Sequence, residues 1–170
     1  MDPFVAPAAS LRLVLTMFVK AYTEVVADYE RITAVMQEQP GSWLGHAAAD
    51  ASSQGERMLV DVGLQVGPPP LERPSRVEVG ELVATNRVAS LPLRIVPQDP
   101  SSLIPLFVGS LDAAWLGAGR THLALSLQYD PPFGFVGRVA DRALLHRVAE
   151  ATAHRFLQKV TDQLTVLLAA

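Results

Sequence analysis

The sequence contains no cysteine, which excludes a disulfide-bonded scaffold and any zinc or iron–sulfur site held by thiolates. Charge is also sparse: 18% of the residues are charged and 49% are hydrophobic, whereas an average domain has about 25% charged residues. Lys and Arg number 14 against 17 Asp and Glu, and they are scattered, without the basic stripe typical of nucleic-acid binding. We therefore expect no nucleic-acid partner, and the lack of cysteine fits a cytoplasmic protein.

The sequence also lacks a hydrophobic run long enough to cross a membrane. The segment Leu11–Val19 is interrupted by Arg12 and Thr16 and falls short of the roughly 20 residues that a membrane helix needs. No basic segment precedes it and no cleavage site follows it, so a signal peptide is not expected. We predict no transmembrane segment, a flexible N-terminal arm over residues 1–10 and a single domain over residues 11–170.

The first third of the chain contains two kinds of hydrophobic period. Residues Leu11–Met17 alternate between apolar and polar, which predicts a strand. A spacing of three and four residues follows and predicts a helix ended by Pro40–Gly41; its stripe is Tyr22, Val25, Tyr29, Ile32 and Met36. A second short helix is expected over Ser42–Ala51, followed by a turn at Ser52–Gly55.

The middle of the chain is typical of antiparallel strands, because apolar and polar residues alternate over several short segments. The expected strands are Met58–Val66, Val77–Arg87, Ser90–Val96, Phe107–Leu116 and Thr121–Tyr129. A long helix is then expected from about Val136 to Leu168, where neither Gly nor Pro interrupts the sequence after Gly137. This order predicts an α+β domain in which the long helix covers the single apolar face of an antiparallel sheet.

Three segments of the C-terminal half resemble the START-like superfamily, also called SRPBCC. They are Gly119–Leu125, Tyr129–Gly134 and Asp141–Ala149. This superfamily includes polyketide cyclases and lipid-transfer domains, and the resemblance implies a helix-grip fold. In that fold a curved sheet wraps around the long C-terminal helix, two short helices follow the first strand, and an apolar cavity lies inside. The superfamily has no universal catalytic residue, so none is transferred to this chain.

The candidate ligand-binding residues are those expected to surround this cavity. Strand parity selects Met58, Val60, Leu93, Phe107, Leu111, Leu125, Leu127 and Tyr129. Trp43 and His46 lie on the second helix, which closes one end of the cavity in the helix-grip fold, and they fit either ligand contact or simple packing and exposure. Phe133 lies in the Pro-rich corner before the long helix. It fits either a lid over the mouth of the cavity or a ring buried in a rigid strand-to-helix corner. The Tyr129 hydroxyl needs a ligand, a water or a backbone carbonyl as its partner.

The sequence predicts no catalytic residue, no metal ligand and no cofactor. His146, Glu150 and His154 recur every four residues, a spacing that could hold a metal, but we expect this helix face to be solvated. The leading hypothesis is binding of a hydrophobic small molecule, such as a lipid, polyketide or quinone, for storage, transport or sequestration. The alternatives are a polyketide cyclase or dehydratase type of enzyme, and a partner-binding module with a packed interior. The oligomeric state is left open.

Overall fold

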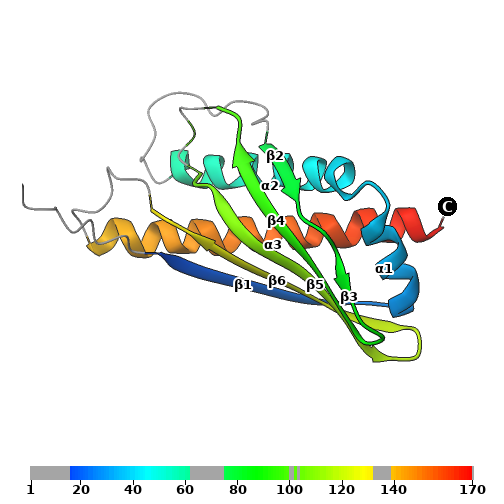
Figure 1. Cartoon of the computed structure of the whole chain (residues 1–170). Coiled ribbons are helices and arrows are strands. Elements are labelled where there is room, and N and C mark those ends of the chain that lie inside the picture. The colour runs from blue at the N-terminus through cyan, green and yellow to red at the C-terminus, as the bar shows by residue number, and fades with distance from the viewer. Residues whose placement is uncertain (1–15, 62–74, 100–101, 103, 132–138, 170) are drawn as a thin grey trace, which may run out of the picture.

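The described part of the computed structural model comprises residues 16–61, 75–99, 102, 104–131 and 139–169. The elements follow one another as β1 (Met17–Val25), α1 (Tyr29–Gln37), α2 (Pro40–Asp61), β2 (Ser75–Val79), β3 (Val83–Ala84), β4 (Val88–Pro97), β5 (Phe107–Gly117), β6 (Arg120–Tyr129) and α3 (Val139–Ala169). The strands form one antiparallel sheet in the order β1-β6-β5-β4-β2, and β3 also pairs with β4 (Figure 1). The chain therefore has the predicted α+β helix-grip architecture.

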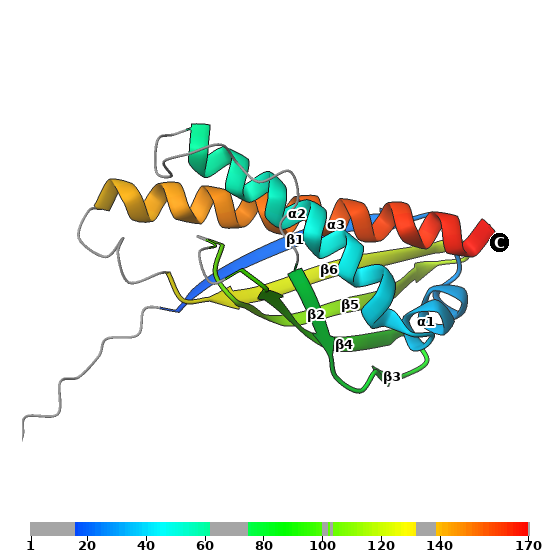
Figure 2. The ribbon, with the colours of Figure 1, turned by 90° about the horizontal axis from the view of Figure 1, so that it is seen from above.

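The helices lie together against one face of this sheet. Figure 2 shows α3 running along the length of the sheet with α2 beside it, while α1 lies near the C-terminal end of α3. At 1.5 Å per residue, the 31 residues of α3 span about 46 Å. One helix thus covers the sheet from end to end, as the sequence predicted.

Strand parity places the apolar side chains on the covered face. In β6, Leu123, Leu125, Leu127 and Tyr129 are all buried, and the residues between them are partly or fully exposed. They lie opposite inward residues of β5, so that Leu111 faces Leu125 and Phe107 faces Tyr129 across the sheet. The predicted parity of this strand is confirmed.

The first strand extends well beyond the predicted end at Met17. Buried Val19, Ala21 and Val25 alternate with exposed residues, and β1 pairs with β6 along its whole length. The prediction of a helix from Tyr22 is wrong up to Asp28, where α1 has not yet begun. Val19, Ala21 and Val25 instead follow a two-residue period that pairing with β6 stabilises, and Tyr22 points to the exposed face. The predicted arm over residues 1–10 and the segment Leu11–Leu15 lie outside the described residues.

The second helix is longer than predicted and includes the segment expected to be a turn. Helix α2 has 22 residues, and the strand predicted from Met58 is wrong up to Asp61, beyond which residues 62–66 lie outside the described part. The physical reason is the small-residue face of α2. A Cβ atom on Gly55 would lie 2.5 Å from Thr152 Oγ1, so Ser52–Gly55 brings α2 into close contact with α3 instead of turning the chain.

Candidate ligand-binding site

The inner face of the sheet forms a continuous apolar wall opposite α2 and α3. The predicted residues on β4, β5 and β6 all belong to this wall and are at most 3% exposed: Leu93, Phe107, Leu111, Leu125, Leu127 and Tyr129. Helix α3 supplies the opposite wall through buried residues that include Val148, Ala153, Phe156 and Val160. The sequence thus predicted correctly that these sheet residues point inward, and their assignment to a ligand site stays a prediction.

A small cavity lies where this wall meets both long helices. Its volume is about 10 Å³, and it is lined by Ile95, Phe107 and Leu127 from the sheet, by Ala51 from α2, and by Ala153 and Phe156 from α3. Such a volume suits one water molecule at most. The interior formed by the described residues is therefore closely packed around this point, and a larger ligand requires side chains to move.

The hydroxyl groups at this cavity are used within the protein. Thr152 Oγ1 donates to the carbonyl oxygen of Val148 at 2.8 Å. Ser75 Oγ donates to Ser52 Oγ at 2.8 Å, and both Ser52 and Thr152 also line the cavity. Because these hydrogen bonds are satisfied locally, the cavity favours apolar atoms over polar ones.

A polar group stands at the end of the apolar wall, where β6 finishes. The Tyr129 ring lies beside Phe107, with 5.4 Å between ring centroids, and its hydroxyl lies 3.3 Å from His146 Nδ1. His146 Nε2 is in turn 3.4 Å from Glu150 Oε1. Burial and, to a smaller extent, the charge of Glu150 raise the pKa of Tyr129 to about 12, so the phenol stays protonated at neutral pH.

This contact corrects one prediction from the sequence. His154 and Glu150 are exposed as expected for a solvated helix face, but the His146 side chain is 33% exposed and reaches inward to Tyr129. The reason is that His146 directly follows the buried Leu145 and therefore lies at the margin of the apolar stripe, where the last residue of β6 meets it. Helical periodicity alone did not reveal a partner from another element.

Of the other predicted residues, the three whose side chains the structure describes, Trp43, His46 and Met58, do not line this cavity. Trp43 is buried in the first turn of α2, and its indole Nε1 has no hydrogen-bond partner among the described residues. His46 is exposed and Met58 is partly buried. The side chain of Val60 and the whole of Phe133 lie outside the described residues, so their assignment to the site stays a prediction.

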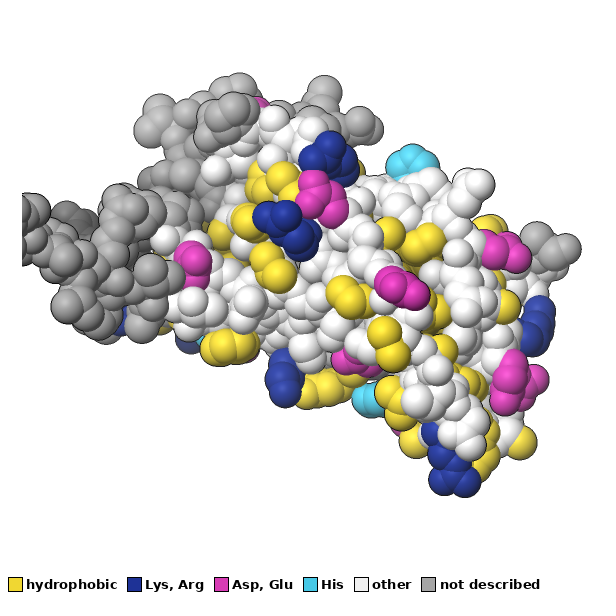
Figure 3. Space-filling view, viewed as in Figure 1, with side chains coloured by type: hydrophobic (Ala, Val, Ile, Leu, Met, Phe, Trp, Pro, Cys, Tyr) yellow, Lys and Arg dark blue, Asp and Glu magenta, His cyan; other side chains and the backbone are white. Residues whose placement is uncertain are grey.

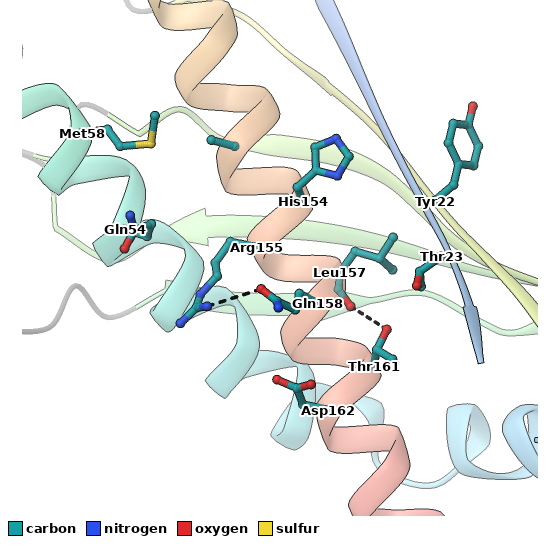
Figure 4. Close-up of a pocket in the computed structure, with 11 residues that line it drawn as sticks. Tyr22, Thr23, Gln54, Met58, His154, Arg155, Leu157, Gln158, Thr161 and Asp162 are labelled. Carbon is teal, nitrogen blue, oxygen red and sulfur yellow. Dashed lines mark hydrogen bonds between the residues drawn. The ribbon is translucent and has the colours of Figure 1, made fainter. Parts of the chain in front are cut away.

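Met58 instead lines an open groove on the outer side of α3. The groove has a volume of about 660 Å³ and lies between α2, α3 and β1. Figure 4 shows His154 and Arg155 leaving α3 in different directions, and Arg155 Nε is 2.6 Å from Asp50 Oδ2 of α2. The Arg155 guanidinium thus joins α2 to α3 at this groove. Polar and charged side chains line the groove together with apolar ones, so it is a solvent-open surface of mixed polarity rather than an apolar site.

Metal binding and membrane crossing each make a specific demand on the described residues. Among them, no group of three or more His, Asp or Glu side chains is placed to hold a metal ion. None of the described helices combines the length and the apolar composition needed to cross a membrane.

No protein-family model and no curated protein matches this chain. Among solved structures, the chain is similar to the Zhui aromatase/cyclase from a Streptomyces species, with 17% identity, 89% and 94% of the two chains covered, and a TM-score of 0.39. The chain is also similar to a norcoclaurine synthase from Thalictrum flavum, with 15% identity, 85% of this chain and 96% of that chain covered, and a TM-score of 0.42. For a protein from Thermus thermophilus, the identity is 14%, the alignment covers 89% of this chain and 99% of that chain, and the TM-score is 0.42.

Proposed function

We propose that this chain binds a hydrophobic small molecule, such as a lipid, polyketide or quinone, between the inner face of the sheet and α3. The observation that carries the proposal is the cavity at Phe107, Leu127 and Phe156, which lies in an otherwise continuous apolar wall. Ligand pockets in proteins are mostly apolar with a few polar anchors, and the Tyr129 hydroxyl stands at the end of this wall. Storage, transport or sequestration of a ligand there needs no catalytic group.

The proposal requires the cavity to open, because its volume of about 10 Å³ is far below that of such a ligand. The two aromatic rings that line it, Phe107 and Phe156, are its largest side chains. Rotation of either ring changes the free volume more than movement of the alanines around it. We therefore infer that ligand entry moves these rings.

The test compares variants that enlarge or fill the cavity. Phe156→Leu should strengthen binding of the neutral dye N-phenyl-1-naphthylamine, and Ala153→Leu should weaken it. Ala151→Leu is the matched control, since Ala151 lies on the same helix but lines the outer groove. Dye titration, with melting temperatures to verify folding, measures all three. Equal dye affinity in every variant would overturn the proposal. Solvent extraction of the purified protein, followed by mass spectrometry, would identify a retained ligand.

A partner-binding module with a packed interior is the second candidate. Two observations favour it: the close packing around the cavity, and the large apolar side chains exposed on the outside of the molecule. Phe18 is 65% exposed, Tyr22 56% and Trp115 45%, and Figure 3 shows apolar patches between charged side chains over one face. Absence of dye binding in the parent chain and in Phe156→Leu would favour this module over a ligand-binding protein.

An enzyme of the polyketide cyclase or dehydratase type is the third candidate, favoured by the Tyr129–His146 contact. Such reactions need a positioned acid or base, and these two groups are within hydrogen-bonding distance at the apolar wall. Turnover of a polyketide mimic that is lost in Tyr129→Phe would support it. Binding of the mimic without turnover would leave the ligand-binding proposal in place.

A further inference from the structure

Tyr129, His146 and Glu150 form a line of hydrogen-bonding groups that leads from the interior to solvent. Tyr129 is 3% exposed, while the side chains of His146 and Glu150 are 33% and 51% exposed. A buried tyrosine usually finds a partner, and a His–Glu pair four residues apart on a helix is common. The unusual feature is their combination, because the carboxylate contacts one imidazole nitrogen and the buried phenol contacts the other.

The carboxylate of Glu150, 3.4 Å from His146 Nε2, favours one direction for the hydrogen bond between Tyr129 and His146. Glu150 is an acceptor when ionised, so its contact with His146 Nε2 favours a proton on that nitrogen. In the neutral imidazole Nδ1 is then an acceptor, and the Tyr129 hydroxyl donates its proton to it. Met17 Sδ lies 3.5 Å from the same hydroxyl and is also an acceptor, although a weak one.

Both contacts therefore consume the single proton of Tyr129 within the protein. Its oxygen retains lone pairs that accept a hydrogen bond from a further donor. A ligand hydroxyl satisfies this oxygen, whereas a ketone or an ether brings a second acceptor against it. An acceptor ligand would have to remove the Tyr129 proton from His146, at the cost of that hydrogen bond.

We propose that Tyr129, oriented by His146 and Glu150, anchors the hydroxyl group of the ligand, so that the preferred ligands are apolar molecules carrying a phenol or an enol. This inference rests on the proposed ligand-binding function and specifies the ligand class for that site. Tyr129 is the binding residue, and the other two are positioning residues. Their effect is on the choice between donor and acceptor ligands, which a purely structural role would leave unchanged.

The experiment uses two probes of nearly the same shape, 1-naphthol and its methyl ether 1-methoxynaphthalene. The wild-type chain should bind 1-naphthol more tightly by about 3- to 10-fold, the effect of one net hydrogen bond. Tyr129→Phe should remove this preference and leave the affinity for the ether within about twofold, since the hydroxyl alone is lost. Dissociation constants at neutral pH come from titration of the probe fluorescence.

The positioning residues are tested with a matched pair on the same helix. His146→Leu frees the Tyr129 proton for acceptor ligands, so the preference for 1-naphthol should fall at least to half. His154→Leu changes an exposed histidine two turns further on and should leave the preference unchanged. Melting temperatures confirm that both variants are folded under the conditions of the titration.

Each outcome separates the ligand class from the proposed function. Equal binding of both probes by the wild type, or a preference that survives in Tyr129→Phe, overturns the hydroxyl anchor and leaves apolar ligand binding in place. Failure of both naphthalenes while N-phenyl-1-naphthylamine binds also overturns the anchor alone. Failure of all three probes overturns the proposed function, and the anchor with it.

Discussion

At the scale of single residues, two glycines of α2 show how closely this helix approaches its neighbours. A Cβ atom at Gly55 would lie 2.5 Å from Thr152 Oγ1 and 2.7 Å from Ile104 Cδ1, whereas one at Gly45 would meet no described atom within 4 Å beyond its own turn of helix. Gly55→Ala should therefore destabilise the protein by roughly 1–3 kcal/mol through overpacking. Gly45→Ala, the control in the same helix, should stabilise it by up to about 1 kcal/mol.

Urea unfolding of both variants measures this difference. Similar effects of the two substitutions would mean that α2 shifts away from α3 without loss of stability, contrary to the close contact described above. Serine content misled the prediction of a turn here: Ser52 and Ser53 are buried, and Ser53 Oγ donates to the carbonyl oxygen of Ala49 within the helix. Local composition carries no information about the partner helix that makes small residues favourable.

The candidate site shows the same division between local pattern and long-range contact. The inward direction of Leu125, Leu127 and Tyr129 follows from a two-residue period within one strand, and the sequence predicted it correctly. The contact of Tyr129 with His146 joins residues from different elements. This contact depends on how α3 packs against the end of β6. The spacing of apolar residues within either segment gives no information about that packing.

At the scale of one element, the faces of β6 can be tested by placing the same large ring on each side. Leu125 is fully buried and lies opposite Ala21 and Leu111, while Ser126 is on the outer face opposite Lys20 and Ser110. Leu125→Trp should cost roughly 1–3 kcal/mol, because the closely packed interior has no room for the larger ring. Ser126→Trp should change the stability by no more than about 0.5 kcal/mol.

Thermal melting of the two variants decides between the faces. A larger loss of stability in Ser126→Trp than in Leu125→Trp would show that the inward and outward faces of β6 are assigned the wrong way round, because a register shift of one residue moves every side chain to the other face. Strands β4 to β6 and helix α3 were predictable because each has one dominant period along its length. Strand β1 was not, because the spacing of Tyr22 and Val25 suggests one face of a helix, whereas pairing with β6 makes a strand in which Tyr22 is exposed and Val25 is buried.

At the scale of the whole molecule, α3 is the cover that keeps the apolar wall away from water. It contributes buried Leu145, Val148, Phe156, Val160 and Leu164 to the core, and Figures 1 and 2 show it along the full length of the sheet. Without this helix the part of the inner face that α2 does not cover would be exposed, and large exposed apolar surfaces lead to aggregation.

Ending the chain before Leu144 should therefore give insoluble protein, because every core residue of α3 from Leu145 onwards is removed. The control is a chain that ends after Leu164. It retains this core set and loses a terminal segment in which Val166 is 66% and Leu167 40% exposed. It also loses the hydrogen bond from Arg31 Nη2 to the Leu168 carbonyl oxygen, so it should stay soluble and melt at a somewhat lower temperature. Solubility after expression and the cooperativity of thermal melting measure both chains. A shorter chain that is soluble and melts cooperatively would show that the sheet has another cover, and the apolar wall could then no longer be assigned to a ligand site between the sheet and α3.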